Sequence, residues 1–419
     1  MSRRDYPDLR QDVRRSILER IDLSREVSDE EVLDLIDAEV IRGAKSGALC
    51  YADMQRMRQD IYYSIRRLDV LQELMDDPEI TEIMINGGDA LFVERRGVIE
   101  AYPGRFSSES RLQDVIQQIV SACDRIVNAS NPIVDCRLPD GSRVNVVLPP
   151  IALNGPVMTI RRFPKEPITM EKLILLGSVP PEIAAFLKSL VKAGYNIFVS
   201  GGTGSGKTTL LNVLSEAIPG TERVITIEDS AELQLIGIPN LVRMEMRDAN
   251  LEGGGEITIR DLIRASLRMR PDRIIVGEVR GAETIDMLQA MNTGHDGSMS
   301  TGHANSARDM LRRLETMVLM GGVELPVSAI RSQIAAGLDI IVHLGRLRDR
   351  TRRVLTVDEV TGENSGEIQL RTLYRFKEEG TDAKGRIIGS WTKEAELAAR
   401  GKLISSGVPW PPEESAGPQ

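Results

Sequence analysis

The spacing of apolar positions divides the first part of the chain into two patterns. Across Leu23–Tyr63, apolar residues recur at helical intervals between charged ones, which predicts amphipathic helices. From Thr81 onward they alternate as in a half-buried strand, and Asn86–Asp89 has the residues of a turn before a second strand-like run. We therefore predict an N-terminal helical region at residues 1–74 and a small α+β domain at residues 75–163.

The elements of the small domain follow from the same alternation. Pro139-Asp140-Gly141 has turn chemistry and separates two strands, and Gly97 marks another turn. We expect strands at Thr81–Ile85, Ala90–Glu94, Ile133–Leu138, Ser142–Leu148 and Thr159–Phe163, and a helix at Leu112–Val127.

Beyond a linker expected at residues 164–172, strand-like runs alternate with helical stretches, which is typical of a parallel sheet with helical crossovers. The expected strands are Ile197–Ser200, Arg223–Ile227, Leu241–Met246, Arg273–Val276 and Gly297–Thr301, followed by the strand-like runs Arg353–Val360 and Glu367–Arg375. We expect this α/β domain to span residues 173–380. Residues 381–419 are expected to form a polar tail, whose Trp391 and Trp410 could pack on the body.

The bulk composition is that of a soluble globular protein of two or three domains, because 41% of the 419 residues are hydrophobic and 27% are charged. The net charge of -9 does not favour a nonspecific grip on nucleic acid. The three cysteines, Cys50, Cys123 and Cys136, form no C-x-x-C pair. They argue against a disulfide framework or a structural zinc site and suit a reducing cytosol.

No apolar run is long enough to span a bilayer. The best candidate, Ile334–Leu344, is short and is interrupted by Gly337 and Asp339. The charged N-terminus is not followed by an apolar signal core. We expect a cytoplasmic protein without an integral membrane segment, and docking onto a membrane complex is compatible with this expectation.

The strongest chemical signal is a glycine-rich loop between a buried strand and a helix. Gly201 to Thr208 fits G-x-x-x-x-G-K-[ST] in the strand–loop–helix context that phosphate binding requires. Glycines let backbone N–H groups converge on an anion, and the helix N-terminus adds positive charge. Lys207 is expected to reach the β- and γ-phosphates, and the Thr208 hydroxyl to bind Mg²⁺. The expected nucleotide contacts are Gly201, Gly202, Thr203, Gly204, Ser205, Gly206, Lys207, Thr208 and Thr209. The alternative, an ordinary glycine-rich turn, does not account for the Lys-Thr pair at this spacing.

Carboxylates follow two of the predicted strands. Glu228, Asp229 and Glu232 come after one strand, and Glu278 ends another. In parallel α/β sheets, ligands bind at the carboxyl ends of strands. A carboxylate there can orient water or hold the metal, so Glu278 is a candidate catalytic residue and Mg²⁺ ligand. For Asp229 and Glu232, a role as solvated loop acids stays equally open.

Two further groups of residues carry weaker signals. His295 and His303 lie in a stretch rich in Gly, Ser and Thr that has no nearby cysteine. This argues against zinc and leaves γ-phosphate sensing and a structural role as alternatives. Arg260, Arg264 and Arg268 share one helical face. They could contact phosphates, pair with acids of a neighbouring subunit, or form a solvated face.

Taken with these motifs, the chain from about Asp69 to about Phe376 resembles the secretion ATPase superfamily of type II secretion, type IV pili and type IV secretion. Within it, the chain is most similar to the TadA/CpaF branch, which assembles tight-adherence pili. The motifs that carry the resemblance are Ile80–Gly87, Val93–Gly97, Leu138–Asn145, Thr159–Phe163, Gly201–Thr208, Ile227–Asp229, Arg270–Gly281 and Thr301–Asn305. Gly277 before Glu278 is typical of the family, and the absence of a tetracysteine insert favours the TadA/CpaF branch.

This resemblance implies a RecA-like P-loop ATPase domain that follows a small, PAS-like α+β domain, with ATP bound between the two. It implies that Glu228 and Glu278 are the catalytic acids, without deciding which is the base, and that His303 belongs to the same site. Arg143, with Arg161 or Arg162, is expected to approach the phosphates.

The resemblance also implies a homo-hexamer that works with inner-membrane platform proteins at the cytoplasmic face of the membrane. Three alternatives stay open. The first is a related motor of type IV secretion, of an archaeal-type flagellum or of pilus retraction. The second is a nucleic-acid translocase, against which the acidic net charge argues. The third is a nucleotide-gated scaffold without turnover, against which the intact acids argue.

Overall fold

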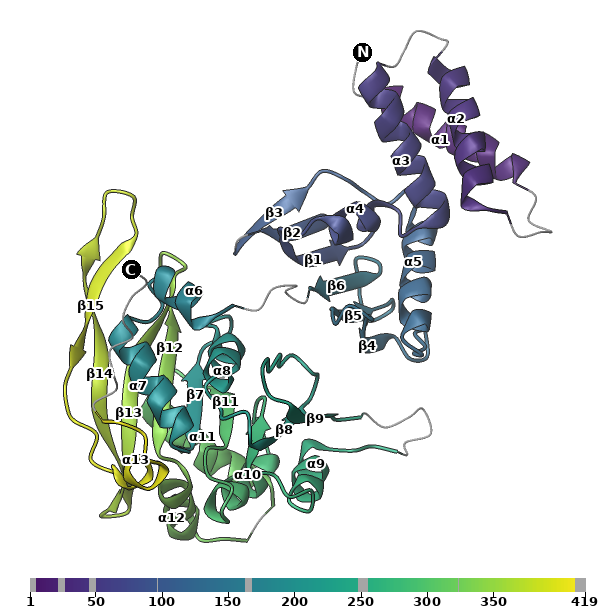
Figure 1. Ribbon diagram of the computed structural model, residues 1–419. Helices are drawn as coiled ribbons and strands as arrows, with labels where there is room; N and C mark the ends of the chain where they lie inside the picture. The colour runs from purple at the N-terminus through teal and green to yellow at the C-terminus, as the bar shows by residue number, and fades with distance from the viewer. Residues whose placement is uncertain are drawn as a thin grey trace. The chain divides into compact units, whose positions relative to one another are not determined.

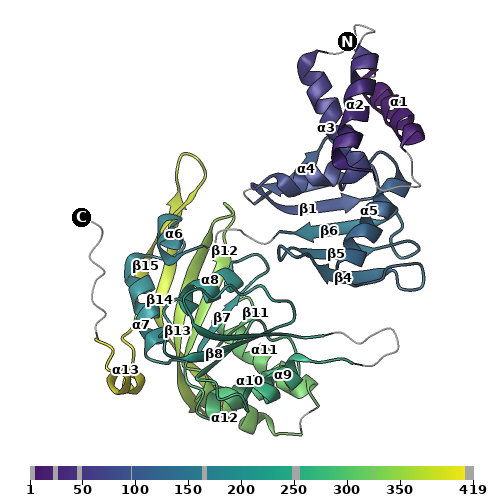
Figure 2. The same ribbon diagram turned by 45° about the vertical axis from the view of Figure 1, so that its right-hand side comes forward.

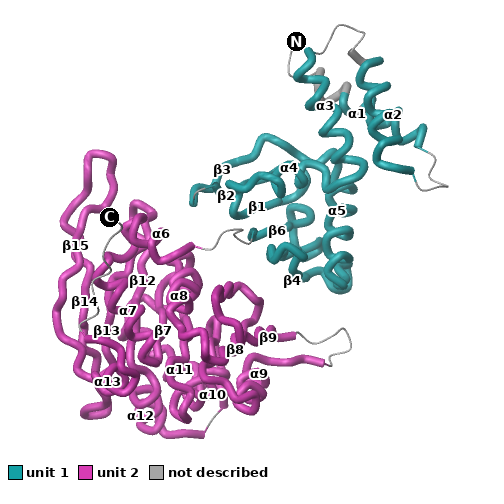
Figure 3. Tube along the Cα trace, in the orientation of Figure 1, with its two compact units in different colours: residues 1–165 teal, residues 166–419 magenta. Residues whose placement is uncertain are grey.

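The computed structural model of the chain describes residues 5–21, 27–44, 50–95, 97–162, 168–247, 255–322 and 324–410. The chain divides into two compact units, residues 1–165 and 166–419 (Figure 3). The predicted linker, residues 164–172, lies partly outside the described residues, and helix α6 (Met170–Leu175) begins within it. Phe163, expected to end the last strand of the small domain, also lies outside them.

The first unit begins with helices, of which the first three bury their apolar faces against one another. The helices are α1 (Asp5–Arg20), α2 (Asp29–Ala44), α3 (Tyr51–Arg66) and α4 (Val70–Asp76) (Figure 1). Ile17, Ile36 and Ile61 come from the first three helices and are fully buried in one cluster. The Ser28 hydroxyl accepts a hydrogen bond from the backbone N–H of Glu31 at 3.2 Å, which satisfies one donor of the first turn of α2.

The rest of the first unit is an antiparallel sheet covered by one helix (Figure 2). Its strands are β1 (Ile80–Asn86), β2 (Leu91–Arg95), β3 (Val98–Tyr102), β4 (Ile133–Arg137), β5 (Arg143–Val147) and β6 (Val157–Arg161), in the order β3-β2-β1-β6-β5-β4. Helix α5 (Glu109–Ala122) buries Leu112 and Ile116 against residues of this sheet. No strand is predicted at β3, because Val98–Tyr102 does not alternate between apolar and polar residues. In the structure, Val98 and Ile99 are both exposed on this edge strand.

The second unit is built on a mixed sheet of nine strands. They are β7 (Ile197–Gly201), β8 (Arg223–Glu228), β9 (Asn240–Glu245), β10 (Arg273–Val276), β11 (Met299–His303), β12 (Ile340–Arg346), β13 (Arg352–Asn364), β14 (Glu367–Thr381) and β15 (Ile387–Lys393). Their order is β15-β14-β13-β12-β7-β11-β10-β8-β9. The six strands from β12 to β9 in this order pair in parallel, and β13, β14 and β15 extend the sheet antiparallel.

Helices bury both faces of the parallel part of this sheet, which explains why β7 and β10 are buried at every position. Residues of α7 (Pro181–Lys192) and α8 (Lys207–Ser215) belong to one apolar cluster. Residues of α9 (Ile259–Ser266), α10 (Glu283–Asn292), α11 (Ala307–Met320) and α12 (Val327–Gly337) belong to the other. This is the α/β architecture that the alternating pattern predicts.

The apolar run Ile334–Leu344 is divided between two elements. Its first residues finish α12, and Ile340 begins β12, so the run supplies a central strand that sequence analysis did not assign. Asp339 lies between them, and its carboxylate accepts a hydrogen bond from the backbone N–H of Asn196 at 2.7 Å. In the part of the chain that the structure describes, no helix is long and apolar enough to cross a membrane.

The stretch predicted as a polar tail, residues 381–419, is instead part of the second unit as far as residue 410. Strand β15 pairs with β14, and α13 (Gly401–Ser406) follows. The Trp391 indole donates a hydrogen bond to the carbonyl of Val354 at 2.7 Å. The ring of Trp410 packs edge-on against that of Phe186, with 5.4 Å between the ring centroids. Both tryptophans therefore pack on the body.

The amino end of β7 is fastened by polar contacts from several segments. The Lys402 ammonium of α13 lies 2.7 Å from both Asp296 and Asp339. Asn196, the residue before β7, donates its side-chain amide to the carbonyl of Gly337 at 2.8 Å and accepts from the backbone N–H of Ser298 at 3.0 Å. Because Asn196 is buried, these bonds satisfy groups that would otherwise be costly to enclose.

Candidate nucleotide-binding and hydrolysis site

The predicted phosphate loop joins β7 to α8 at the carboxyl edge of the sheet. A Cβ at Gly201 would lie 2.5 Å from the carbonyl oxygen of Leu344, so this position has room only for glycine. Gly204 and Gly206 have φ of 68° and 96°, a left-handed backbone that glycine adopts without strain. No side chain caps α8, which leaves its first-turn N–H groups available to an anion. Thr208 and Thr209 lie in this first turn.

Lys207 connects the loop to the predicted histidine. Its ammonium donates to the carbonyl of Gly202 at 3.1 Å and lies 3.4 Å from Nδ1 of His303. Nε2 of His303 lies 3.0 Å from Oε1 of Glu278. Burial lowers the pKa of His303, and the positive charge of Lys207 acts in the same direction although Glu278 opposes it. A neutral imidazole with its proton on Nε2 would accept from Lys207 at Nδ1, and its Nε2 faces the carboxylate of Glu278.

Glu278 is held from its other side by Arg280, a residue that sequence analysis did not select. The Arg280 guanidinium lies 2.8 Å from Glu278 and 3.2 Å from Asp229. The hydrogen bond to Glu278 raises the pKa of Arg280. Asp229 is therefore connected to Glu278 through Arg280, and a role for Asp229 in the site stays a prediction. The signal that could have found Arg280 is its position two residues beyond Glu278 in a loop at the carboxyl edge.

Glu228 has a different environment, although it also ends a parallel strand. It is only 2% exposed, and its Oε1 accepts the backbone N–H groups of Glu232 and Leu233 at 2.8 and 2.9 Å. Burial raises the pKa of Glu228 to about 7, although these two hydrogen bonds act in the opposite direction. A Cβ at Gly277 would lie 2.9 Å from Cγ of Glu228. Glycine before Glu278 thus makes room for the buried acid of the neighbouring strand.

The predicted Mg²⁺ ligands fit a site that depends on nucleotide. Among the described residues, no group of three or more His, Cys, Asp or Glu side chains could hold a metal ion. Mg²⁺ in phosphate-loop sites takes most of its ligands from phosphates and water and needs few from protein. Thr208 is partly exposed at the start of α8, and Glu278 offers carboxylate oxygens at the same edge. Both are hard oxygen donors of the kind that Mg²⁺ prefers.

The arginines predicted to approach the phosphates lie in the first unit. Arg143 on β5 and Arg161 on β6 are directly opposite each other. Arg162 donates to the backbone carbonyls of Asp77 and, at 3.3 Å, Ile80, which ties β6 to the start of β1. Arg162 therefore binds backbone carbonyls of its own unit, which is a structural role. An approach of Arg143 and Arg161 to the nucleotide stays a prediction.

The remaining candidate residues, His295 and the arginines of α9, can be judged by their contacts. His295 precedes β11, at the edge opposite His303, and its Nδ1 lies 3.2 Å from the carbonyl of Ala290. Arg260 and Arg264 of α9 both bind the buried Asp286 of α10, at 2.7 and 3.0 Å. These two arginines pair within their own unit, which disfavours their interpretation as a solvated basic face.

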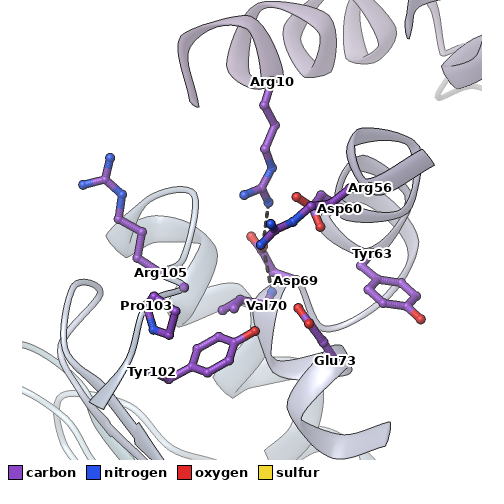
Figure 4. A pocket seen from close by; sticks show the side chains of 11 residues that line it. Arg10, Arg56, Asp60, Tyr63, Asp69, Val70, Glu73, Tyr102, Pro103 and Arg105 are labelled. Atoms are coloured by element: carbon purple, nitrogen blue, oxygen red, sulfur yellow. Dashed lines mark hydrogen bonds and ion pairs between the residues drawn. The ribbon is translucent and has the colours of Figure 1, made fainter. Parts of the chain in front are cut away.

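A cavity of about 120 Å³ lies in the first unit, between the N-terminal helices and the sheet (Figure 4). Arg10 points from α1 toward Asp69, and their side chains lie 3.3 Å apart. Asp69 also accepts from the Ser107 hydroxyl at 2.9 Å.

Comparison with known proteins shows which family has an α+β domain followed by a phosphate loop. The family model described as "Type II/IV secretion system protein" matches residues 66–387, well over half of the chain. The chain belongs to the type II/IV secretion system protein family. Members of this family are P-loop ATPases, and so is this protein. The match covers both the phosphate loop and the small α+β domain.

Relatives in the same family are conjugal transfer and type IV secretion proteins. A putative conjugal transfer protein of Mycobacterium tuberculosis is 35% identical over 311 residues, which cover 73% of this chain and 87% of that protein. VirB11 of Brucella abortus is 32% identical over 303 residues, covering 66% and 84%. The solved structure of the ATPase DotB from Legionella pneumophila is 23% identical, covers 68% of this chain and 78% of its own, and aligns with a TM-score of 0.51. That structural likeness concerns the fold alone.

Proposed function

We propose that this protein is a six-subunit ATP-hydrolysing motor that powers assembly of a tight-adherence type IV pilus, or a related secretion step, through a membrane-anchored machine. The observation that supports hydrolysis is the series of contacts from Lys207 through His303 to Glu278 at the phosphate loop. It combines a cation for phosphates, a histidine and a carboxylate at the carboxyl edge of the sheet. A scaffold without turnover would have no need of this arrangement.

Glu278 is the residue best placed to act on the attacking water. Its carboxylate is at the open edge of the sheet, whereas the Oε1 of Glu228 is occupied by two backbone N–H groups. His303 and Arg280 hold Glu278 in place, and Lys207 binds the phosphates. Thr208 and Glu278 would hold Mg²⁺, which neutralises phosphate charge when bound with the nucleotide.

Coupling to movement is proposed for Arg143 and Arg161. A guanidinium is always charged and can hold two phosphate oxygens, so it is suited to grip a γ-phosphate. Such an arginine is worth about a thousandfold or more in rate in other phosphoryl-transfer enzymes. Loss of the γ-phosphate would release the first unit, and hydrolysis would thereby become motion of one unit against the other.

A second candidate machine is a type IV secretion or conjugal transfer system. It is favoured by the names of the relatives, whereas the sequence motifs and the missing cysteine insert favour the tight-adherence pilus. In either case we propose that the motor acts at the cytoplasmic face of the inner membrane, against platform proteins of the machine. The net charge of -9 argues against nucleic acid as a direct ligand of the motor.

The nucleotide site is tested by melting temperature with and without Mg-ATP. A ligand that binds only the native state stabilises it, so the wild type should melt at a higher temperature with Mg-ATP. Lys207→Ala should lose this shift, and Arg312→Ala, which removes an exposed arginine of α11, should keep it. An equal shift in Lys207→Ala and wild type would refute the phosphate-loop assignment.

The machine is tested in cells by replacing the gene with a Glu278→Gln version. Loss of surface pili with normal DNA transfer would support the tight-adherence assignment. Loss of DNA transfer with normal pili would support the conjugal one. Light scattering of the purified protein with nucleotide should report about six subunits, and a strict monomer with full activity over a wide dilution range would contradict the ring.

A further inference from the structure

The turn between β12 and β13 carries two arginines to the phosphate loop. Arg352 donates from Nε to the carbonyl of Gly204 at 2.8 Å. A guanidinium nitrogen of Arg346 lies 3.7 Å from where a Cβ on Gly204 would stand. The same hairpin places Arg346 and Arg352 directly opposite each other on paired strands. Like charges in such a pair destabilise a sheet, so the sequence keeps this pair at a cost to folding.

Neither arginine has an acidic partner among the described residues, whereas two other arginines of this hairpin, Arg348 and Arg353, have partners. Arg348 forms an ion pair with Glu378, and Arg353 stacks over the ring of Phe376 at 4.8 Å. Arg346 and Arg352 are both exposed. Two guanidinium groups without a counter-charge thus lie beside a loop built to bind an anion.

The hairpin that carries them is braced at its tip. The Asp349 carboxylate accepts the hydroxyl of Thr351 at 2.6 Å and the backbone N–H of Ile387, in β15, at 2.7 Å. Leu347 donates its backbone N–H to the carbonyl of Thr351 at 2.8 Å. Residues mounted on such a tied turn lose less freedom when they bind a ligand, which favours affinity.

The sheet order indicates which part of a nucleotide these arginines face. Strands β11 and β10 lie on one side of β7 and carry His303 and, just beyond β10, Glu278. Strand β12 lies on the other side. Arg346 and Arg352 therefore flank the loop opposite the groups that act at the γ-phosphate.

We propose that Arg346 and Arg352 form a subsite for the α- and β-phosphates, the part of the nucleotide that ATP and ADP share. The inference rests on the proposed nucleotide site and adds that this anion is gripped by two cations of the same chain. The bound phosphates supply the missing counter-charge and relieve the repulsion between the two arginines. The subsite therefore raises affinity for ATP and ADP by the same factor and has little effect on the rate at saturating ATP.

The test is a titration of the full chain with a fluorescent ADP, and with a nonhydrolysable ATP analogue, in Arg346→Gln, Arg352→Gln and the double variant. The double variant should bind both nucleotides about tenfold or more weakly, because charge-assisted hydrogen bonds are lost. The kcat at saturating ATP should change less than about threefold. Arg348→Gln, on the same hairpin, is the matched control and should bind as the wild type does.

The apo melting temperature separates this proposal from a structural role. Removing one of two repelling arginines should leave the apo melting temperature unchanged or raise it, whereas a structural role predicts a fall. Equal ADP affinity in the double variant and in Arg348→Gln would refute the subsite, as would a loss confined to the ATP analogue. A wild type that binds neither nucleotide would refute the proposed function itself.

Discussion

The carboxyl ends of β8 and β10 carry the same residue type in two opposite environments. Glu228 at the end of β8 is buried, and its Oε1 is bound by backbone N–H groups. Glu278 just after β10 is held between His303 and Arg280 at the open edge. The difference teaches that a strand-end acid is not catalytic by position alone. Burial raises the pKa of Glu228 and so moves that acid toward neutrality.

The largest expected effect separates the two acids by rate. Glu278→Gln removes the charge and the proton acceptor and keeps the shape, so kcat should fall by about 10²- to 10⁴-fold while nucleotide binding is retained. Phosphate release measures the rate, and melting temperature with Mg-ATP measures binding. Glu367→Gln, in an exposed position on β14, is the control. If Glu228→Gln cost as much in kcat as Glu278→Gln, the assignment of the base to Glu278 would be lost.

The next effect concerns stability and pH at Glu228. Its folded pKa is raised from the ordinary 4.5 to about 7 by burial. The folded state therefore binds more protons than the unfolded state between these values, and this group makes stability fall as pH rises from 4.5 to 7. At about 1.4 kcal/mol per pKa unit, the loss is about 3 kcal/mol above pH 7.

Glu228→Gln should remove this contribution. Relative to wild type, the variant should gain up to about 3 kcal/mol of unfolding free energy at pH 8.5 and little at pH 4.5. Urea unfolding at several pH values gives both numbers. A difference between variant and wild type that does not change with pH would mean that Glu228 keeps an ordinary pKa.

A smaller effect tests the room that Gly277 provides. Its Cβ would meet Cγ of Glu228 at 2.9 Å, so Gly277→Ala should cost about 1–3 kcal/mol through overpacking. Gly281→Ala is the control, since its nearest neighbour is the Glu283 carboxylate at 3.4 Å. If the clash is with Glu228, combining Gly277→Ala with Glu228→Ala should cost less than the sum of the two single changes. Strict additivity would contradict the clash.

The smallest effect is expected at Arg280. Arg280→Ala should lower kcat about tenfold, because Glu278 loses one of its two positioning contacts. The same substitution should change little in a Glu278→Gln background, since its target is already gone. Arg312→Ala again serves as control. Equal losses in both backgrounds would show that Arg280 acts on something other than Glu278.

The features that could be predicted from the sequence are those encoded by residues adjacent to one another in the sequence. The phosphate loop is a contiguous motif, and most of the strands that converge on it are short apolar runs. Strand β12 was missed because its apolar residues continue those of α12 across Asp339. Strand β15 was missed because it is a polar strand at the edge of the sheet. Arg280 was overlooked although it lies only two residues beyond Glu278. Arg346 and Arg352 could not be selected, because what distinguishes them is their proximity to the phosphate loop, which is remote in the sequence.

Strand β7 has one end at the phosphate loop and the other fastened by Asn196, Asp339 and Lys402. The carboxyl end of β7 would therefore feel any movement of a bound nucleotide, and the amino end is held in place by these polar contacts. Without the contacts at its amino end, β7 could shift along the neighbouring strands when the phosphate loop moves. The residue before β7 is bonded to Asp339, in the segment before β12, and Lys402 of α13 pairs with Asp339. If ATP hydrolysis moves the phosphate loop, we expect these contacts to limit sliding of β7 and to share the displacement with the neighbouring strands. Under the proposed motor function, helix α13 would thereby help to hold the sheet in place during the work of the protein.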